Sequence, residues 1–313
     1  MNALPALKTY GMAERASHLD FDIRDHSVRP QITQPHRHEY FQMLVALHGE
    51  SMQTIGGAVR RIRPGTVTFV LPYRSHVAVM PPDAEFYVIS FSLRFLRPDT
   101  HLDPLELEYV SPQAAPEIAP FLVQEHVDFV LAGADLQTLR DALAEMLREN
   151  AERRFGAALI LRGHLLHVIG MVCRSHEAAL TELLEARPSR NGGRDWLVRV
   201  SRLMRDRLCD DLALQDAAAA ANLSQGHLAH ALKRETGRTF TELLTERRME
   251  RARELLVNST LRLSEIAHST GFADESYFAR RFRQWFGVSP GSYRRSCEQE
   301  STGKAQFRTV RRE

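Results

Sequence analysis

Residues 263–295 constrain the fold of this chain more than any other stretch, because their apolar side chains recur at three- and four-residue steps on both sides of one glycine. This spacing is typical of two short amphipathic helices, and Gly271 falls where a tight turn would join them. Asp274 is placed to cap the second helix. Its exposed face would carry Glu275, Ser276, Arg280 and Arg281. Such a unit buries one stripe between its helices and leaves a polar, arginine-bearing stripe of the kind that enters a DNA major groove.

A weaker copy of this pattern lies upstream, at residues 212–239. Leu214 and Ala218 take the places of two apolar residues of the later copy, and Asn222 stands where that copy has its glycine. Asparagine tolerates left-handed backbone better than most residues, so the turn is retained. Ser224 is expected to cap the second helix of this copy. The exposed face of that helix would carry Gln225, Gly226, His227, His230, Lys233 and Arg234.

One longer helix is predicted between the two copies. Thr239 and Glu242 form the pattern of a capping box, and apolar residues then recur along one face to about residue 257. A helix from 240 to 257 would be about 27 Å long. That length can set two recognition helices about one DNA turn apart, ~34 Å, in successive major grooves. Two such units in one chain would bind an asymmetric DNA site.

The segments SEIAHSTGF, SYFARRFRQWFGVSP and YRR closely resemble the C-terminal signature of the AraC/XylS-type bacterial transcription regulators. The resemblance covers residues 195–295. It implies an all-α double helix-turn-helix domain that binds double-stranded promoter or operator DNA and works with RNA polymerase, most readily as an activator. The predicted base-contacting residues are Arg280 and Glu275 on the second recognition helix, and Gln225 and His230 on the first. His227 is expected to pack or to contact phosphate.

The N-terminal half predicts a β-barrel or sandwich, because short segments rich in Val, Ile, Phe and Thr alternate with Gly and Pro between residues 21 and 92. Gly56-Gly57 and Pro64-Gly65 are predicted turns. The predicted strands are 41–47, 51–55, 58–63, 66–71, 76–80 and 86–92. The period of two residues places Gln42, Leu44 and Ala46 inside the barrel, and Phe41, Met43 and Val45 outside it.

The segments PHRHEYFQMLVALHG and RPGTVTFVLPYRSH resemble the two halves of the cupin barrel motif. The matching residues are His36, His38, Gln42, Gly49, Gly65, Pro72 and His76. The resemblance implies a cupin-like sensing domain that binds a small-molecule effector. Its candidate effector-binding residues are His36, His38, Gln42, Tyr73, Arg74 and His76. Arg74 would pair with a carboxylate of the ligand, or else lie on the surface of its loop.

In metal-binding cupins the positions of these three histidines are ligands, and the position of Gln42 usually holds a glutamate. Three imidazoles can hold Zn, Fe or Mn. The amide in place of the carboxylate favours a polar lining instead, so we expect neither a metal nor another cofactor. The amide also weighs against an alternative function, a dioxygenase-like cupin metalloenzyme with a helical appendage. An architectural DNA-binding protein, the third hypothesis, leaves the N-terminal half without a role.

The apolar period becomes helical beyond about residue 121. One stripe is predicted to pack on the barrel and to form the seam of a homodimer that uses residues 130–175. It consists of Leu136, Leu139, Leu143, Met146 and Leu147. A second helix is interpreted as intramolecular core. Along one side it carries Phe155, Leu159, Arg162, Leu166, Ile169 and Cys173, and the stripe is widened by Leu161, Leu165, Val168 and Val172.

The fold class expected from these patterns is α+β with two domains. The first is a cupin-like effector-binding and dimerisation domain at 1–187, in which residues 1–20 show little periodicity and are predicted to be a loose arm. A linker at 188–194 leads to the double helix-turn-helix domain at 195–295, and a flexible tail at 296–313 follows.

Charge and cysteine content agree with this division. From residue 191 onward there are 22 Lys and Arg against 16 Asp and Glu, whereas the chain as a whole carries a formal charge of only +2. A basic C-terminal part fits binding of a polyanion by one domain. The three cysteines are far apart, no secretory start is present, and no apolar run reaches the ~18 to 20 residues of a membrane span. We therefore expect a cytoplasmic protein that does not bind membranes.

Overall fold

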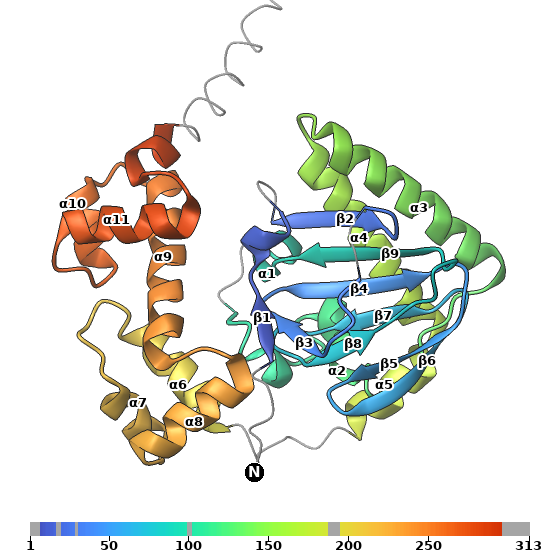
Figure 1. Ribbon diagram of the computed structural model, residues 1–313, viewed down its shortest axis with the longest axis horizontal. Helices are drawn as coiled ribbons and strands as arrows, with labels where there is room; N and C mark the ends of the chain where they lie inside the picture. The colour runs from blue at the N-terminus through green and yellow to red at the C-terminus, as the bar shows by residue number, and fades with distance from the viewer. Residues whose placement is uncertain (1–6, 17–19, 29–30, 99–101, 187–194, 296–313) are drawn as a thin grey trace, which may run out of the picture. The chain divides into compact units, whose positions relative to one another are not determined.

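The computed structural model describes residues 7–16, 20–28, 31–98, 102–186 and 195–295, which fold as two compact units (Figure 1). The units are Met1–Arg194 and Asp195–Glu313. The first is β-rich and the second is helical, as the predicted α+β class requires. The predicted linker at 188–194 and tail at 296–313 lie outside the described residues.

The described part of the first unit contains two β-sheets that face each other. One has the strand order β1-β3-β8-β5-β6 and the other the order β2-β9-β4-β7. The strands of the first sheet are β1 (Lys8–Tyr10), β3 (His36–His38), β8 (His76–Ala78), β5 (Ser51–Ile55) and β6 (Ala58–Ile62). Those of the second are β2 (Phe21–Asp25), β9 (Phe86–Phe91), β4 (Phe41–Ala46) and β7 (Val67–Val70). All six predicted strands are present within a few residues of their predicted ends.

The alternation predicted for β4 is confirmed. Leu44 and Ala46 lie in a buried cluster with Phe86 and Val88 of β9, on the side that faces the first sheet. The other three side chains of the strand belong to a larger core on the opposite side; they are Phe41, Met43 and Val45. The β5–β6 hairpin turns at Gly56 and Gly57, whose φ angles are +57° and +98°. Two consecutive positive φ angles are what a two-residue hairpin turn demands.

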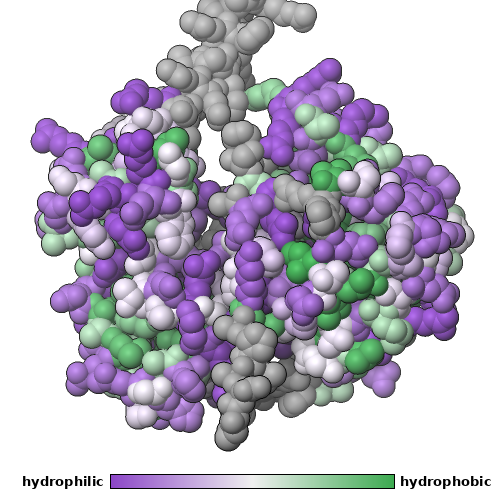
Figure 2. Space-filling model, viewed as in Figure 1, coloured by the Kyte–Doolittle hydropathy of each residue, from purple (hydrophilic) through white to green (hydrophobic). Residues whose placement is uncertain are grey.

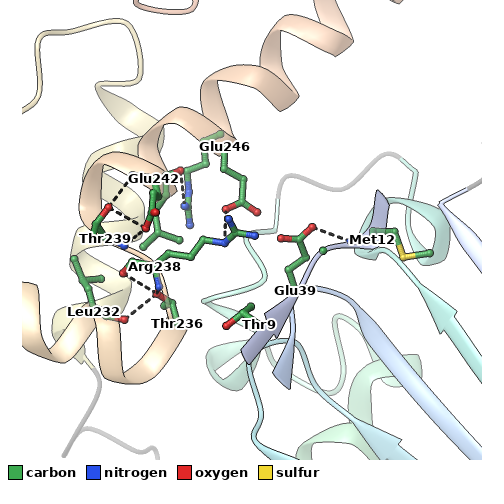
Figure 3. Close-up of polar contacts among 12 residues, drawn as sticks. Thr9, Met12, Glu39, Leu232, Thr236, Arg238, Thr239, Glu242 and Glu246 are labelled. Carbon is green, nitrogen blue, oxygen red and sulfur yellow. Dashed lines mark hydrogen bonds and ion pairs between the residues drawn. The ribbon is translucent and has the colours of Figure 1, made fainter. Parts of the chain in front are cut away.

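The N-terminal arm is more ordered than predicted over residues 7–16. β1 pairs in parallel with β3, so that Lys8 lies opposite His36 and Tyr10 opposite His38. A 3-10 turn, η1 (Met12–Glu14), follows, and the Met12 amide donates to the Glu39 carboxylate at 2.9 Å (Figure 3). The prediction of a loose arm is wrong for this segment, because β1 satisfies the backbone groups of β3 that would otherwise form a sheet edge. Residues 1–6 and 17–19 lie outside the described residues.

Helices cover the outer side of the second sheet. They are the short α1 (Leu93–Leu96) and α2 (Ala119–Val123), the long α3 (Gly133–Glu152) and α4 (Ala157–Ser175), and α5 (Glu177–Glu185), with short 3-10 turns η2 (Leu107–Tyr109) and η3 (Pro116–Ile118) between the first two. In Figure 1 α4 runs behind the strands of this sheet. A single core joins the helices to the strands through residues such as Phe69, Phe121 and Leu165.

The stripe proposed as a dimer seam on α3 is buried within the chain itself. Leu139, Leu143 and Met146 expose 0%, 1% and 0% of their surface and belong to the core shared with the sheet and α4. These side chains have no surface left to offer a second copy, so this seam was predicted wrongly. Periodicity alone cannot say which layer covers an apolar stripe.

The intramolecular core predicted for the second helix, α4, is confirmed for part of its stripe and wrong for the rest. Its core-facing residues are Leu161, Leu165, Val168 and Val172, whereas Phe155, Leu159 and Leu166 lie exposed. Within the described part of the chain, α4 is the one helix long and apolar enough to cross a membrane, a test that core helices of globular proteins also pass.

The second unit contains six named helices among its described residues. They are α6 (Asp195–Asp206), α7 (Leu214–Ala221), α8 (Gln225–Thr236), α9 (Phe240–Asn258), α10 (Leu263–Ser269) and α11 (Glu275–Phe286). Residues 290–295 are also helical, and Ser289 caps them by accepting from the Ser292 amide at 3.2 Å. Figure 1 shows α7 and α8 near one end of α9, with α10 and α11 beside its other end. This is the predicted arrangement of two helix pairs joined by one long helix.

Candidate functional site

The turn inside each helix pair has the predicted left-handed backbone. Asn222 ends α7 with φ +56° and ψ +43°, and Gly271 follows α10 with φ +76°. At Gly271 the chain also passes close to Arg248 of α9, since a Cβ there would lie 2.7 Å from the guanidinium carbon. Arg248 in turn donates to the backbone oxygens of Leu208 and Asp210 at 3.0 and 2.6 Å. The second turn therefore requires glycine for two reasons, its left-handed backbone and its close approach to Arg248.

Each recognition helix begins at the predicted cap. The Ser224 hydroxyl accepts from the His227 amide at 3.3 Å, and the Asp274 carboxylate accepts from the Tyr277 amide at 2.5 Å. Both side chains thus satisfy an amide that the first turn leaves without a helical partner. Their role is to fix where α8 and α11 begin.

Buried aromatic and aliphatic residues orient the two recognition helices. Phe278 and Phe282 of α11 are fully buried in a cluster with Ile266, Phe272 and Met249. Leu228 and Leu232 occupy the same positions in α8, both at 0% exposure. The opposite faces are consequently turned to solvent. The exposed predicted DNA-binding residues are Ser224, Gln225, Gly226, His227, His230, Lys233, Arg234, Asp274, Glu275, Ser276 and Arg280.

Arg281 differs from the others because it is half-buried and donates to Gln284 at 3.0 Å. Arg280 is exposed, with its guanidinium 5.5 Å from the Tyr277 ring centroid. Sequence reasoning did not select Tyr277, which is 45% exposed on the same face. Its position three residues after the Asp274 cap and three before Arg280 was the available signal. Figure 2 shows that hydrophilic side chains dominate the visible face of the helical unit.

The two cations at the end of α8 are engaged within the chain. Lys233 lies 3.8 Å from the Glu242 carboxylate, and Arg234 lies 3.0 Å from that of Glu235. These partners offset much of the positive charge of the first recognition helix. The second helix therefore offers the stronger electrostatic attraction for phosphate.

The start of α9 is fixed by the predicted capping box (Figure 3). Thr239 accepts from the Glu242 amide at 3.3 Å, and the Thr239 amide donates to the Glu242 carboxylate at 2.7 Å. The bond from the Thr239 amide lowers the pKa of Glu242 below its ordinary value. Arg238 lies 3.6 Å from Glu246, and the Thr236 hydroxyl donates to the Leu232 carbonyl at 2.8 Å. These contacts set the corner between the first recognition helix and the long helix.

A partly open cavity of about 50 Å³ lies between the two sheets of the first unit. Its lining combines polar and charged groups with aliphatic and aromatic groups. The lining residues are Arg24, Asp25, His26, Gln31, Ile32, His36, Gln42, Leu44, His76, Ala78, Phe86 and Val88. Of the predicted effector-binding residues, His36, Gln42 and His76 are among them. The lining residues from β2 were not predicted, because that five-residue strand was not recognised.

The three cupin-motif histidines are held in one tautomer by backbone carbonyls. His36 Nδ1 lies 3.0 Å from the Gln34 oxygen, His38 Nδ1 2.6 Å from that of Tyr40, and His76 Nδ1 3.1 Å from that of Arg74. A carbonyl oxygen only accepts, so each Nδ1 carries the proton and each Nε2 presents a lone pair. The ring centroids of His36 and His76 are 4.3 Å apart, and those of His38 and His76 4.7 Å.

The surroundings keep these imidazoles uncharged. Burial lowers the pKa of His36, and burial lowers that of His38 well below its ordinary value, with Arg15 adding to both effects. Burial, helped by the neighbouring His36, lowers the pKa of His76 to about 3. All three rings are consequently neutral hydrogen-bond acceptors at neutral pH.

Gln42 completes the polar side of the cavity. Its amide nitrogen lies 3.4 Å from His76 Nε2, a long contact in which the amide donates to the ring. That orientation leaves the Gln42 oxygen as a further acceptor. The His36 ring, the His76 ring and the Gln42 oxygen therefore present lone pairs rather than protons to this part of the cavity.

The other predicted effector-binding residues do not line this cavity. His38 is fully buried and stacks on Tyr40, with ring centroids 4.3 Å apart, and its Nε2 has no hydrogen-bond partner among the described residues. Arg74 lies 2.5 Å from Glu108 and 3.1 Å from Glu125, so its charge is matched within the chain. Tyr73 occupies a turn with φ +60°, and its amide donates to the His38 carbonyl at 2.6 Å.

The metal that the cupin resemblance would allow finds no site in this arrangement. No group of three or more His, Cys, Asp or Glu side chains in the described ranges is placed to hold an ion. The ring centroids of His36 and His38 are 6.4 Å apart, and the fourth position holds an amide where metal-binding cupins usually have a carboxylate. The absence of bound metal stays a prediction for elemental analysis of the purified protein.

Comparison with known proteins gives separate matches for the two parts of the chain. A family model described as an AraC-like ligand binding domain matches residues 19–169, and one described as a helix-turn-helix domain matches residues 217–296. The transcriptional activator NphR of a Rhodococcus species is 40% identical over 119 residues, which cover 37% of this chain and 35% of NphR. The transcriptional activator RhaS of Escherichia coli is 26% identical over 271 residues, covering 85% of this chain and 89% of RhaS.

A solved structure also matches, the C-terminal domain of the response regulator AraT from Geobacillus stearothermophilus. It is 36% identical, with a TM-score of 0.31, over 32% of this chain and 84% of that one. The sequence matches to three curated relatives cover 35% of the length of NphR, 49% of the Msm operon regulatory protein and 31% of PocR. This chain thus covers between about a third and a half of several curated relatives that it matches.

Proposed function

The chain belongs to the AraC family of transcription regulators, and on this premise we propose that it is a sequence-specific DNA-binding activator controlled by a small molecule. The effector binds between the two sheets of the first unit, and the second unit binds operator DNA. The regulator acts in the bacterial cytoplasm as a homodimer and engages RNA polymerase. The relatives are named as regulators, and the chain is not an enzyme; the alternative of a cupin metalloenzyme is set aside.

The observation that carries the DNA-binding role is the duplicated helix pair with its outward polar faces. Buried phenylalanines fix the rotation of α11 about its axis, and the Asp274 cap fixes where it begins. Arg280 is then presented to solvent on a rigid element, which suits a bidentate contact to guanine. One such contact is worth ~1–3 kcal/mol of discrimination.

Arg280→Ala tests this role in the full chain. After the operator is located by a genome-wide footprint, the variant should lose ~10-fold or more in affinity for the operator while largely keeping its affinity for random DNA. Arg251→Ala is the matched control, since this exposed arginine on α9 pairs with Glu254 and its loss removes the same charge. Equal losses on operator and random DNA would show that Arg280 contacts phosphate only.

The chemistry of the cavity narrows the class of effector. The lining offers the lone pairs of His36, His76 and Gln42. It also includes the charged side chains of Arg24 and Asp25, and apolar side chains of β4 and β9. A ligand that fits must direct hydroxyl or amine protons at the imidazoles and place an apolar portion against the side chains of β4 and β9. A carboxylate without other donors would set its own lone pairs against those of the rings and would have to lie against Arg24 instead.

A matched panel of small molecules tests this assignment. Cyclohexanol, cyclohexylamine and cyclohexanecarboxylate have one skeleton and differ in the polar group, and their binding can be followed by ligand-observed NMR. The alcohol and the amine should bind more tightly than the carboxylate, and Gln42→Leu should weaken them whereas Met52→Ala, on the exposed side of β5, should not. If the carboxylate binds best, or if none binds in the cavity, the assignment of a donor-bearing effector fails.

A further inference from the structure

An exposed aromatic ring lies on α11 among the residues predicted to contact DNA. Tyr277 exposes 45% of its surface, whereas the next residue, Phe278, is fully buried. Aromatic side chains are enriched at binding surfaces, because they combine a large apolar area with few rotatable bonds. The packing of the helix pair accounts for the buried half of the Tyr277 ring, but not for the half that is left open to solvent.

Contacts with two residues fix the position of the Tyr277 ring. The Phe272 ring lies next to it, with the centroids 6.1 Å apart and the planes inclined by 47°. Phe272 is itself buried in the core of this helix pair. The Arg280 guanidinium lies 5.5 Å from the Tyr277 centroid. The ring is therefore positioned before any DNA is bound, so little side-chain freedom remains to be lost on binding.

Tyr277 and Arg280 form one surface on the outer face of α11. They are three residues apart, the spacing that sets two side chains next to each other on a helix. Both lie in the first two turns of α11, and the N-terminal part of a recognition helix is the part that contacts base edges. Among the residues that the structure describes, no carboxylate forms an ion pair with Arg280. Its guanidinium is therefore available to a guanine, with the Tyr277 ring beside it.

We propose that Tyr277 contacts the methyl group of a thymine in the base pair next to the guanine bound by Arg280. Thymine is the base that presents a methyl group in the major groove, and apolar or aromatic side chains recognise it by direct contact. Successive base pairs are about 3.4 Å apart along the DNA axis, so two groups 5.5 Å apart can reach neighbouring pairs at the same time. The inference rests on the proposed function and adds to it a second specificity-determining residue with a defined target.

The first recognition helix does not repeat this pair. Tyr277 and Arg280 lie three and six residues after the cap of α11, and the residues at the same distances from the Ser224 cap of α8 are His227 and His230. Each imidazole presents two ring nitrogens that form hydrogen bonds, so it offers a methyl group less apolar surface than a phenol ring does. The thymine next to a guanine is therefore expected in the part of the operator that α11 binds.

Removal of single methyl groups from the operator tests the assignment in the full chain. Deoxyuracil pairs as thymine does but lacks the methyl group, and it replaces each thymine of the operator in turn. At one thymine beside a guanine, the replacement should weaken binding of the wild-type chain about fourfold, the ratio that corresponds to one buried methyl group. Tyr277→Ala should bind the two DNAs equally, whereas Tyr277→Phe, which keeps the ring, should show the wild-type ratio. Fluorescence anisotropy at a fixed salt concentration measures the affinities.

Two controls exclude indirect effects. Tyr109→Ala removes a 37% exposed ring from the first unit and should keep the wild-type ratio. Replacing the neighbouring guanine with 7-deazaguanine should weaken binding of the wild-type chain but not of Arg280→Ala, which identifies the guanine that Arg280 contacts. Each ratio compares two DNAs with one protein, so a general loss of stability cancels. If thermal unfolding shows that Tyr277→Ala does not fold, Tyr277→Gln, which keeps a good helix former at this position, replaces it.

Four results would overturn the inference. The wild-type chain could respond to no thymine, or Tyr277→Ala could respond to the same thymines as wild type. The thymine could lie away from the guanine that Arg280 contacts. Tyr277→Phe could lose affinity equally for operator and random DNA, which would mean that the hydroxyl contacts phosphate only. In each case the proposed function stands if the operator is bound and Arg280→Ala weakens that binding selectively, whereas a chain that binds no operator removes the proposed function and this inference with it.

Discussion

His36, His38 and His76 are held neutral by the same backbone carbonyls that orient them. Each imidazole donates a hydrogen bond from Nδ1–H to a main-chain oxygen. Burial opposes the binding of a second proton at Nε2. Protonating any one of the rings would also place a positive charge within contact of its neighbours. The cluster therefore lowers the free energy of unfolding when the solution becomes acidic.

The free energy of unfolding should accordingly fall as the pH is lowered from about 6.5 towards 3. Above pH ~6.5 the histidines are neutral in both states and contribute no pH dependence. Below it the unfolded chain takes up protons that the folded chain, with its lowered pKa values, does not, until the folded pKa of about 3 is reached for His76. Each histidine then contributes at most ~1.4 kcal/mol per pH unit. Urea unfolding at pH 7.5, 6.0 and 5.0 measures the slope.

His76→Asn removes one titrating group from the cluster and should make this slope shallower. The exposed His268 of α10 provides the control, since His268→Asn should leave the slope unchanged. The same slope in His76→Asn as in wild type would show that the ring is already charged, or solvated, in the folded chain.

The turns between paired helices decide whether the recognition helices are presented at all. Gly271→Ala should destabilise the second unit by about 1–3 kcal/mol, because it puts a Cβ on left-handed backbone and displaces the Arg248 guanidinium. Chemical denaturation of the full chain, followed by the fluorescence of Trp196 and Trp285, both in the helical unit, measures the change.

Gly226→Ala is the matched control with the opposite expectation. Gly226 lies in the first turn of α8, and a Cβ there would meet no atom within 4 Å. Alanine in a helix is favoured over glycine by up to ~1 kcal/mol, so this variant should be as stable as wild type or more so. If both substitutions destabilise equally, the effect of Gly271→Ala does not come from its left-handed turn.

The helical unit could be predicted almost completely because local rules determine its elements. The caps at Ser224, Thr239 and Asp274 and the left-handed turn at Asn222 all depend on residues within a few positions of one another. Six strands of the β-rich unit were predicted, whereas β1, β2 and β3 were missed. The short strands β1 and β3 have three residues each, too few to show a period, and they pair across 25 intervening residues.

Prediction from the sequence was weakest where a side chain has a choice of partner. Arg74 follows the cupin motif in sequence, yet Glu108 and Glu125 bind it from a distant part of the chain. Likewise, the stripes of α3 and α4 look alike in sequence, and only the packing of the layers shows that one is buried and the other exposed. Periodicity identifies an apolar face, but not the surface that covers it.

At the scale of the whole molecule, regulation requires that the effector bind one arrangement of the chain more tightly than another. A difference of ~1–3 kcal/mol would be ordinary for such coupling. The N-terminal segment is placed to respond, because β1 pairs with β3 along the strand that carries His36 and His38. The Tyr10 ring also lies edge-on to His36, with centroids 5.5 Å apart. A ligand that moves the His36 ring would therefore change how β1 packs against β3.

Deletion of residues 2–18 should make expression from the target promoter insensitive to the effector, while operator binding in vitro persists. Tyr10→Ala is the milder companion, since it removes the ring beside His36 and keeps the backbone pairing of β1; it should shift the dose curve without abolishing the response. A promoter reporter measures both variants, and gel-shift assays with the operator show that DNA binding is retained. An unchanged dose curve in the deletion variant would mean that the segment is not the switch. Effector control would then have to reach the helical unit from another part of the β-rich unit.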